Sequence, residues 1–452
     1  MEPMRLSEIA ALFSAELPDG EVKKVVTDTR KIEKDCLFVA LRGERFDGAD
    51  FVEEALESGA AAAISERAFP GRPVITVPDA RKALGRLAAY YKSKFSVLTI
   101  AVTGSSGKTT TKEFLSAVLS ERFRTLKTSG NLNNDIGLPM TIFELDEQHE
   151  ACVLEMGMNH RGELSHLTRI ARPDIAVITN IGTAHIENLG SREGIAQAKL
   201  EILEGLRPDG AVVLNGDEPL LTGSPALAGK KVVRFGLENP EAEVRATDIF
   251  ELSGETDFII ETQDGPFAAV IRTIGRHNVQ NALCAAAVGK LAGLTEEEIK
   301  RGLLNFEATG GRQKIYELSG VRIIDDTYNA NPDSMRAALS VLGSFEGRRI
   351  AVLGDMLELG AYAESAHRTV GEIAAGNAEL LFALGDAACY YKKGALLRGM
   401  EEGAARHFDD AESLGKALAA EVREGDTVLF KGSRGMKMER MIEMLIREWS
   451  DS

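Results

Sequence analysis

The sequence predicts an α/β protein whose mostly parallel sheets are covered by helices on both faces. Short apolar segments rich in β-branched residues alternate with helical segments along most of the chain, which is typical of parallel sheets. The chain contains 44 glycines, which suits many turns between strands and helices. Its 452 residues exceed one typical core and predict about three domains.

The composition narrows the functional classes. The chain has 53 basic and 69 acidic residues, and the net charge of −16 argues against binding to nucleic acid or to anionic membrane surfaces. Its four cysteines lie far apart and form no C-x-x-C pair, which indicates a reducing, cytoplasmic setting. No apolar run approaches the roughly 18 residues of a membrane span, and acids interrupt the N-terminal apolar stretch. Neither membrane insertion nor a signal peptide is therefore expected.

The alternation divides into three units. In the first, we expect helices over residues 6–13, 49–58 and 81–93 and strands over 21–27, 36–40, 61–64 and 74–77. In the second, we expect strands over 97–102, 151–155, 174–179 and 211–214 and helices over 162–171, 192–206, 278–292 and 295–305, the last with Thr295 as N-cap. Consecutive strands between 232 and 273 indicate an antiparallel flap or an extension of the sheet.

The third unit begins after Gly310-Gly311-Arg312. We expect its strands over 321–325, 349–353, 380–384 and 427–430 and its helices over 334–342 and 438–447. The expected domains are therefore residues 1–95, 96–313 and 314–452.

The most specific pattern is LTIAVTGSSGKTTTKE at residues 98–113. An apolar strand runs into a glycine-bearing turn, and a helix opens at Lys108. In this arrangement backbone N–H groups and the helix dipole face a phosphate, the lysine reaches the β- and γ-phosphates, and the hydroxyl of Thr109 can hold Mg²⁺. The spacing is two residues shorter than the usual phosphate-loop pattern, and an ordinary strand-to-helix turn is the alternative. The expected phosphate site comprises Thr103, Gly104, Ser105, Ser106, Gly107, Lys108, Thr109 and Thr110.

Polar residues at two strand ends suggest a metal site. Glu155 ends an apolar strand and His185 follows the next strand and turn, which places both at the carboxyl edge of a parallel sheet. A structural histidine and a helix-capping glutamate are the alternatives. Lys199 shares a helix face with Ile195 and Ile202. Its side chain either extends to water or is buried, neutral and reactive.

Two further segments suggest nucleotide contacts. GRHNVQNALCAAA places Asn278 and Asn281 at the start of a helix, with His277 just before it, so Asn278 is either a helix cap or a contact to base or ribose. DDTYNANPDSM ends a strand in Asp325-Asp326, which fits either a turn or a ribose site.

Eight motifs in order resemble the Mur ligase family: TGSSGKTTTK, EMGMNHRGEL, TNIGTAHIENLGS with AKLEIL, GRHNVQNALCAAA, GGR, DDTYNANPDSM, GDMLELG and KGSRGMKME. The resemblance covers nearly the whole chain, and DDTYNANPDSM and GDMLELG are similar to the member that acts last in the series. Ser106 stands where the family pattern has asparagine. A phosphate turn should tolerate this difference.

The resemblance implies an ATP-dependent amide ligase with a UDP-sugar-peptide-binding N-terminal domain, a central P-loop ATP-binding domain and a Rossmann-like C-terminal domain. It implies that D-alanyl-D-alanine is joined to UDP-N-acetylmuramoyl-tripeptide through an acyl phosphate, in peptidoglycan precursor synthesis, by a cytoplasmic monomer. The ligase that adds the third peptide residue and folylpolyglutamate synthase are the enzymatic alternatives. A nucleotide-driven switch that makes no bond is the alternative from another class.

The resemblance also implies roles for individual residues. Lys108 and Thr109 would serve the phosphates and a first Mg²⁺, together with Glu155, while His185 and an N-carbamylated Lys199 would serve a second Mg²⁺. The expected ATP contacts in the later motifs are Asn278, Asn281, Arg312 toward phosphate and Asp326 toward ribose. The expected uridine-diphosphate contacts are Thr29, Arg30, Phe46 and Asp47. The expected residues near the dipeptide are Asn329, Asn331, Lys431, Ser433 and Arg434.

Overall fold

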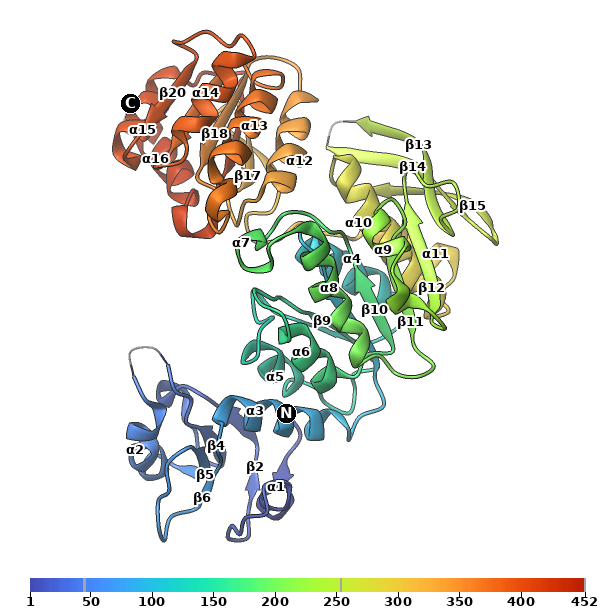
Figure 1. Ribbon diagram of the computed structural model, residues 1–452, viewed down its shortest axis with the longest axis vertical. Helices are drawn as coiled ribbons and strands as arrows, with labels where there is room; N and C mark the ends of the chain where they lie inside the picture. The colour runs from blue at the N-terminus through green and yellow to red at the C-terminus, as the bar shows by residue number, and fades with distance from the viewer. Residues whose placement is uncertain (44–45, 253, 451–452) are drawn as a thin grey trace.

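The computed structural model describes residues 1–43, 46–252 and 254–450. Three α/β parts follow one another along its long axis, from the blue N-terminal part to the orange-red C-terminal part (Figure 1). Helices and strands alternate in each part, so the predicted fold class is confirmed. Within the described residues, no helix combines the length and the apolar character needed to span a bilayer.

The N-terminal part contains two small sheets. Strands β1 and β2 pair antiparallel, and β3 to β6 form a parallel sheet in chain order. The predicted strand over 21–27 is therefore two strands in different sheets. The elements are β1 (Met4–Arg5), α1 (Leu6–Leu12), β2 (Glu21–Val22), β3 (Lys24–Val26), β4 (Cys36–Val39), α2 (Val52–Glu57), β5 (Ala60–Ser65), β6 (Val74–Thr76) and α3 (Ala80–Lys92).

Helix α3 connects this part to the next one. Its apolar face, including Leu84 and Leu87, belongs to a core that also contains residues of the central sheet. The hydroxyl of Tyr91 donates to the carbonyl of Leu145 at 2.6 Å, and a Cβ at Gly85 would lie 2.7 Å from Ile170 Cδ1. The first part is thus packed on the second through α3.

The central part has a sheet whose described strands are ordered β15-β14-β13-β12-β11-β10-β7-β9-β8. Pairing is parallel from β8 to β13 and antiparallel from β13 to β15, so the consecutive strands extend the sheet. The strands are β7 (Leu98–Thr103), β8 (Thr125–Lys127), β9 (Ala151–Glu155), β10 (Ile175–Ile178), β11 (Ala211–Asn215), β12 (Lys231–Gly236), β13 (Val244–Leu252), β14 (Glu255–Thr262) and β15 (Gly265–Ile271). Because β7 lies between β9 and β10, their carboxyl ends are neighbours.

Helices cover both faces of this sheet. Apolar residues of α5, α6 and α8 pack on one face, and those of α4, α10 and α11 pack on the other. The helices are α4 (Lys108–Leu119), α5 (Gly137–Ile142), α6 (Glu163–Ala171), α7 (Ile186–Leu189), α8 (Arg192–Leu200), α9 (Pro219–Thr222), α10 (Arg276–Leu291) and α11 (Glu296–Leu304).

Three predicted helices differ from the observed ones. The helix predicted over 49–58 is a 3₁₀ turn, Gly48–Phe51, followed by α2. The helix predicted over 192–206 ends at Leu200 and continues as the 3₁₀ turn Glu201–Glu204. The helix predicted from residue 278 begins at Arg276 with Gly275 as N-cap. His277 is therefore inside the helix, and the interpretation of Asn278 as its cap is wrong. Thr295 does cap α11, and with Glu298 it forms a capping box.

The C-terminal part has described strands in the order β16-β17-β21-β18-β19-β20, parallel except for β16. Helices α12 to α14 pack on one face, and α15 and α16 on the other. Elements that were not predicted from the sequence are β1, β8, β16, β20, α5, α7, α9, α13, α14 and α15. The elements are β16 (Lys314–Leu318), β17 (Val321–Asp326), α12 (Pro332–Gly343), β18 (Arg349–Gly354), α13 (Ala363–Ala375), β19 (Leu380–Leu384), α14 (Cys389–Leu397), β20 (Ala405–Phe408), α15 (Ala411–Glu421), β21 (Thr427–Lys431) and α16 (Glu439–Ser450).

A close contact between α11 and α4 yields a stability test. A Cβ at Gly302 would lie 2.4 Å from the Cα of Val118, which is backbone and cannot turn aside. We expect Gly302→Ala to lower the free energy of unfolding by about 1–3 kcal/mol in urea titrations. Gly403→Ala is the control, because no heavy atom lies within 4 Å of a Cβ there. Equal stability of the two variants would contradict the contact.

Candidate active site

A cavity of about 1060 Å³ lies over the carboxyl ends of the central strands and reaches the C-terminal part. Its wall includes residues 105–110, the ends of β9 and β10, the start of α10 and residues 326–338 at the start of α12. Arg81 of the N-terminal part also lines it. The cavity therefore gathers groups that lie more than 300 residues apart in the sequence.

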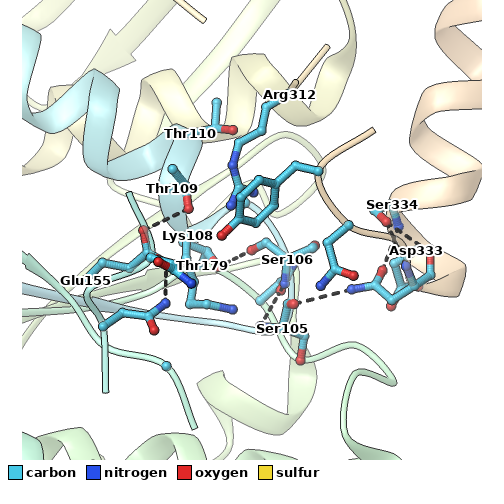
Figure 2. A pocket seen from close by; sticks show the side chains of 18 of the residues that line it. Ser105, Ser106, Lys108, Thr109, Thr110, Glu155, Thr179, Arg312, Asp333 and Ser334 are labelled. Carbon is cyan, nitrogen blue, oxygen red and sulfur yellow. Dashed lines mark hydrogen bonds between the residues drawn. The ribbon is translucent and has the colours of Figure 1, made fainter. Parts of the chain in front are cut away.

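The predicted phosphate turn joins β7 to α4 on the cavity wall (Figure 2). Gly107 is the N-cap of α4 and has a φ of 75°, a region that favours glycine. A Cβ at Gly104 would lie 1.8 Å from Thr179 Oγ1, so only glycine fits there. Thr103 does not line the cavity, because it is buried and donates its hydroxyl to the carbonyl of Met156.

Asn180 fixes the shape of this turn. Its Oδ1 accepts the backbone N–H groups of Ser105 and Ser106 at 3.0 and 2.9 Å, and its Nδ2 donates to Ser106 Oγ at 2.6 Å. The hydroxyl of Ser106 is thus bonded to the residue that follows Thr179, and Thr179 itself donates to the carbonyl of Ser106 (Figure 2). Asn180 was not identified from the sequence, although TNIGTAH contains it.

Lys108 is half-buried, and its side chain is hydrogen-bonded to its own turn. Its Nζ donates to the carbonyl of Gly104 at 2.8 Å. The pKa of this amine is lowered, mainly because its surroundings exclude water and further because of the charge of Arg312. The charge of Glu155 partly offsets this. The ammonium thus lies beside the turn that was predicted to bind phosphate.

The structure brings the predicted pair Thr109 and Glu155 together. Thr109 Oγ1 donates to Glu155 Oε2 at 2.8 Å, and Asn133 Nδ2 donates to Oε1 at 2.8 Å (Figure 2). Glu155 is 2% exposed, and its backbone N–H donates to Thr128 Oγ1. A buried carboxylate beside a hydroxyl, at the phosphate turn, is a suitable ligand set for Mg²⁺.

His185 and Lys199 lie in different settings. His185 lines the cavity with a φ of 62°, and its Nδ1 lies 2.8 Å from Glu358 Oε2, without hydrogen-bond geometry. Lys199 is 1% exposed, which excludes the interpretation in which its amine extends to water. Burial holds the pKa of Lys199 well below its usual range, and the nearby charge of Lys108 adds to this. The lysine does not line the cavity.

The described residues contain no cluster of three or more His, Cys, Asp and Glu side chains that could hold a metal ion. A metal at this site would therefore depend on ligands of other kinds, such as the Thr109 hydroxyl, a carbamate or phosphate oxygens.

The expected nucleotide contacts line the same cavity. Asn281 Oδ1 accepts the Thr111 hydroxyl at 3.0 Å. The amide of Asn278 is engaged, because its Nδ2 donates to Gln313 Oε1 at 2.9 Å and to two groups before α10. Gln313, which was not predicted from the sequence, also accepts from His277 Nε2 through Oε1 and donates its backbone N–H to Asp326.

Arg312 and Asp326 are held by aromatic and charged neighbours. The guanidinium of Arg312 lies 3.9 Å from the centre of the Tyr328 ring, which orients it as a cation–π pair. Asp326 Oδ2 accepts from Lys431 Nζ at 2.5 Å. Asp326 therefore enters the site as a member of an ion pair.

Four of the five residues expected near the dipeptide line the cavity. Asn331 is the N-cap of α12, and its Nδ2 donates to the carbonyl of Ser105 at 3.4 Å, which connects the C-terminal part to the phosphate turn. Asn329 Oδ1 accepts the backbone N–H of Arg434. Ser433 is not on the wall, and its Oγ accepts the backbone N–H of Leu357, which is a structural role.

The four expected uridine-diphosphate contacts lie on the N-terminal part, and none of them lines the cavity. Thr29 and Arg30 belong to the 3₁₀ turn Thr29–Lys31, where Arg30 is exposed and pairs with Asp28 at 2.7 Å. Asp47 caps a second such turn, and Phe46 is 63% exposed. Residues 44 and 45, which precede Phe46, lie outside the described residues.

Known proteins are similar to this chain in sequence and in fold. Three family models match in order: "Mur ligase family, catalytic domain" over residues 21–92, "Mur ligase middle domain" over 102–289 and "Mur ligase, glutamate ligase domain" over 311–434. The UDP-N-acetylmuramoyl-tripeptide–D-alanyl-D-alanine ligase of Bacillus subtilis is 43% identical over 430 residues, which cover 93% of each chain. This chain belongs to the Mur ligase family.

Solved Mur ligases have the same fold. A structure of MurF from Acinetobacter baumannii matches this Mur ligase with a TM-score of 0.92 and 34% identity, covering 99% of each chain. MurF from Thermotoga maritima in complex with ADP matches with a TM-score of 0.87 and 32% identity, covering 95% of this chain and 98% of that one.

The burial of Lys199 yields a test on stability. In the unfolded chain a lysine has a pKa of about 10.4, so at lower pH the unfolded state binds a proton that the native state excludes. We expect Lys199→Met to be more stable than the parent at neutral pH in CO₂-free buffer. The difference should shrink as the pH rises toward about 10, measured by urea unfolding. Lys34→Met, which removes an exposed lysine, is the control. If Lys199→Met raised the free energy of unfolding by the same amount at every pH, the buried, low-pKa setting of Lys199 would be contradicted.

Proposed function

We propose that this Mur ligase joins D-alanyl-D-alanine to UDP-N-acetylmuramoyl-tripeptide, with ATP as the phosphoryl donor. The observation that carries the proposal is the single cavity shared by the phosphate turn and the first residues of α12. A carboxyl group activated at the turn would lie next to residues of the C-terminal part. The relative from Bacillus subtilis is named for this reaction.

The chemistry follows from the low reactivity of a carboxylate toward amines. The γ-phosphoryl group passes from ATP to the tripeptide carboxylate and gives an acyl phosphate, which the amine of the dipeptide attacks. The tetrahedral intermediate then collapses to the amide and phosphate. Lys108 and the N-terminus of α4 would stabilise the phosphoryl charge, so the protein contributes placement and electrostatics.

The metal ligands are part of this proposal. Thr109 and Glu155 would hold one Mg²⁺, and His185 with an N-carbamylated Lys199 would hold a second. The buried amine of Lys199, which its surroundings keep neutral, can take up CO₂ and become an anionic oxygen ligand for a hard cation. Bound Mg²⁺ would spread the charge of the transferring phosphoryl group.

We assign the three parts to the three substrates. Residues 1–95 would bind the UDP-linked tripeptide, 96–313 would bind ATP and 314–452 would bind the dipeptide, in a cytoplasmic monomer. Thr29, Arg30, Phe46 and Asp47 lie outside the cavity, so the N-terminal part would move toward it when substrates bind.

A coupled assay tests the reaction. We expect phosphate release from ATP only when both UDP-N-acetylmuramoyl-tripeptide and D-alanyl-D-alanine are present, with one amide formed per phosphate. Release with neither substrate would instead identify a nucleotide-driven switch. Release that requires a free amino acid and a UDP-dipeptide, or a folate, would identify one of the other ligases.

Replacing Lys199 tests the carbamate. We expect Lys199→Ala to lower kcat by about 100-fold or more, because a ligand of the second Mg²⁺ is lost. Formate or acetate should restore part of the activity by supplying a carboxylate in the cavity left by the side chain. Full activity of the variant, or a loss that no small carboxylate reduces while ATP still binds, would remove the carbamate from the mechanism.

A further inference from the structure

The proposed reaction requires a site for an ammonium group. An α-amino group has a pKa of about 7.7–8.0, so the dipeptide arrives largely protonated at neutral pH. Its nitrogen must be placed beside the acyl phosphate and must lose a proton before it can attack. A carboxylate in the cavity can meet both needs, because its negative charge attracts the ammonium group and its oxygens can accept the proton.

Five described carboxyl groups line the cavity, and two of them accept a hydrogen bond from a side-chain cation. These are Asp135, which pairs with Arg81 at 3.1 Å, and Asp326, which pairs with Lys431 at 2.5 Å. An ammonium ligand would have to displace a side-chain cation from either of them.

Two more are committed to hydrogen bonds. Glu155 receives a side-chain donor on each of its oxygens, at 2.8 Å in both cases. Glu163 accepts the backbone N–H groups of Asn159 and His160, both on Oε2, which fixes the start of α6. Both carboxylates therefore already hold the local structure in place, and an ammonium ligand would compete with these donors for the same charge.

Asp333 differs from these four. Among the described residues its hydrogen-bond donor is the backbone N–H of Thr183, at 3.3 Å to Oδ2. The guanidinium of Arg336 lies 3.6 Å from Oδ1, but the Arg336 side chain is 60% exposed, so water screens this pair. Asp333 therefore retains most of its capacity to accept hydrogen bonds.

Ser105 provides a second acceptor at the same place. It is 5% exposed, it lines the cavity, and its Oγ is buried with no hydrogen-bond partner in the described part of the chain. A Cβ at Gly182 would lie 2.1 Å from Asp333 Oδ2 and 3.2 Å from Ser105 Cβ, so the two side chains meet at this glycine. Figure 2 shows Asp333, at the start of α12, beside the turn that carries Ser105.

We propose that Asp333, together with Ser105 Oγ, binds the ammonium group of the incoming dipeptide and accepts its first proton. The proposal rests on the proposed function and names the residue that handles the nucleophile. The proton passes from nitrogen to the Asp333 carboxylate, which leaves a neutral amine. The lone pair of this amine forms the C–N bond to the acyl carbon while the π electrons of the carbonyl group move to its oxygen. That electron pair then re-forms the C=O bond, and the C–O bond to phosphate breaks, with its electrons leaving on the phosphate. The nitrogen releases its second proton to water and keeps the third as the amide N–H.

A structural role for Asp333 is the competing explanation. It is the second residue of α12, where an acid stabilises a helix through the macrodipole. Glu412 has the same position in α15 and lies outside the cavity, so Glu412→Gln is a matched control for this effect.

The test measures two steps separately in Asp333→Asn: formation of the acyl phosphate and attack by the amine. Hydroxylamine, which is largely unprotonated at neutral pH, captures the acyl phosphate as a hydroxamate without needing a base. We expect hydroxamate formation from ATP and the UDP-tripeptide to match the parent within about 2-fold, while kcat/KM for the dipeptide falls by about 100-fold. Glu412→Gln should change neither rate.

Two results would overturn the proposal. One is an equal loss of hydroxamate and amide, which would mean that Asp333 supports the fold or the phosphate turn. The other is unchanged dipeptide kinetics in Asp333→Asn. Absence of hydroxamate with the parent enzyme would instead reject the acyl-phosphate reaction itself, so the two failures are distinguishable.

Discussion

The contact between Gly104 and Thr179 is the constraint on which the site depends. It presses the phosphate turn against the end of β10, so closely that a side chain at position 104 has no room. The turn then lies where Asn180 can hold two of its N–H groups, and where Thr109 meets Glu155 at the end of β9. A parallel sheet with β7 between β9 and β10 makes these contacts possible, because it brings three carboxyl ends to one edge.

The C-terminal part completes the site from the opposite side. Helix α12 begins at the phosphate turn, and its N-cap Asn331 donates to a carbonyl of that turn. Gly182 and the small, buried side chain of Ser105 lie where α12 meets the phosphate turn, beside the cavity between the two sheets. In the proposed function, the central part would present N–H groups and Lys108 to phosphate, and the start of α12 would present an acceptor to the amine.

The sequence predicted those features that local pattern controls. The strand, turn and helix at residues 98–113 follow from hydrophobic pattern and glycine, and the pairing of Thr109 with Glu155 follows from the shared edge of a parallel sheet. Asn180 was missed because an asparagine after a strand is an ordinary turn residue, and only the close approach at Gly104 gives it a role. The burial of Lys199 was undecided because helical spacing shows which face carries the lysine but not how deeply that face packs into the core. The uridine-diphosphate residues cannot be placed against the cavity by motif alone, since motifs carry no information on how parts are oriented.

The bond from Lys108 to the carbonyl of Gly104 has a consequence for nucleotide capture. An ammonium shielded from water and left without an acceptor would be costly, and this carbonyl supplies the acceptor from within the turn itself. In the proposed function, Lys108 would exchange this carbonyl oxygen for a phosphate oxygen, while the turn keeps the hydrogen bonds from Asn180 that shape it. Little conformational entropy would then be lost at the turn on binding, so the site would be organised in advance for its energy source.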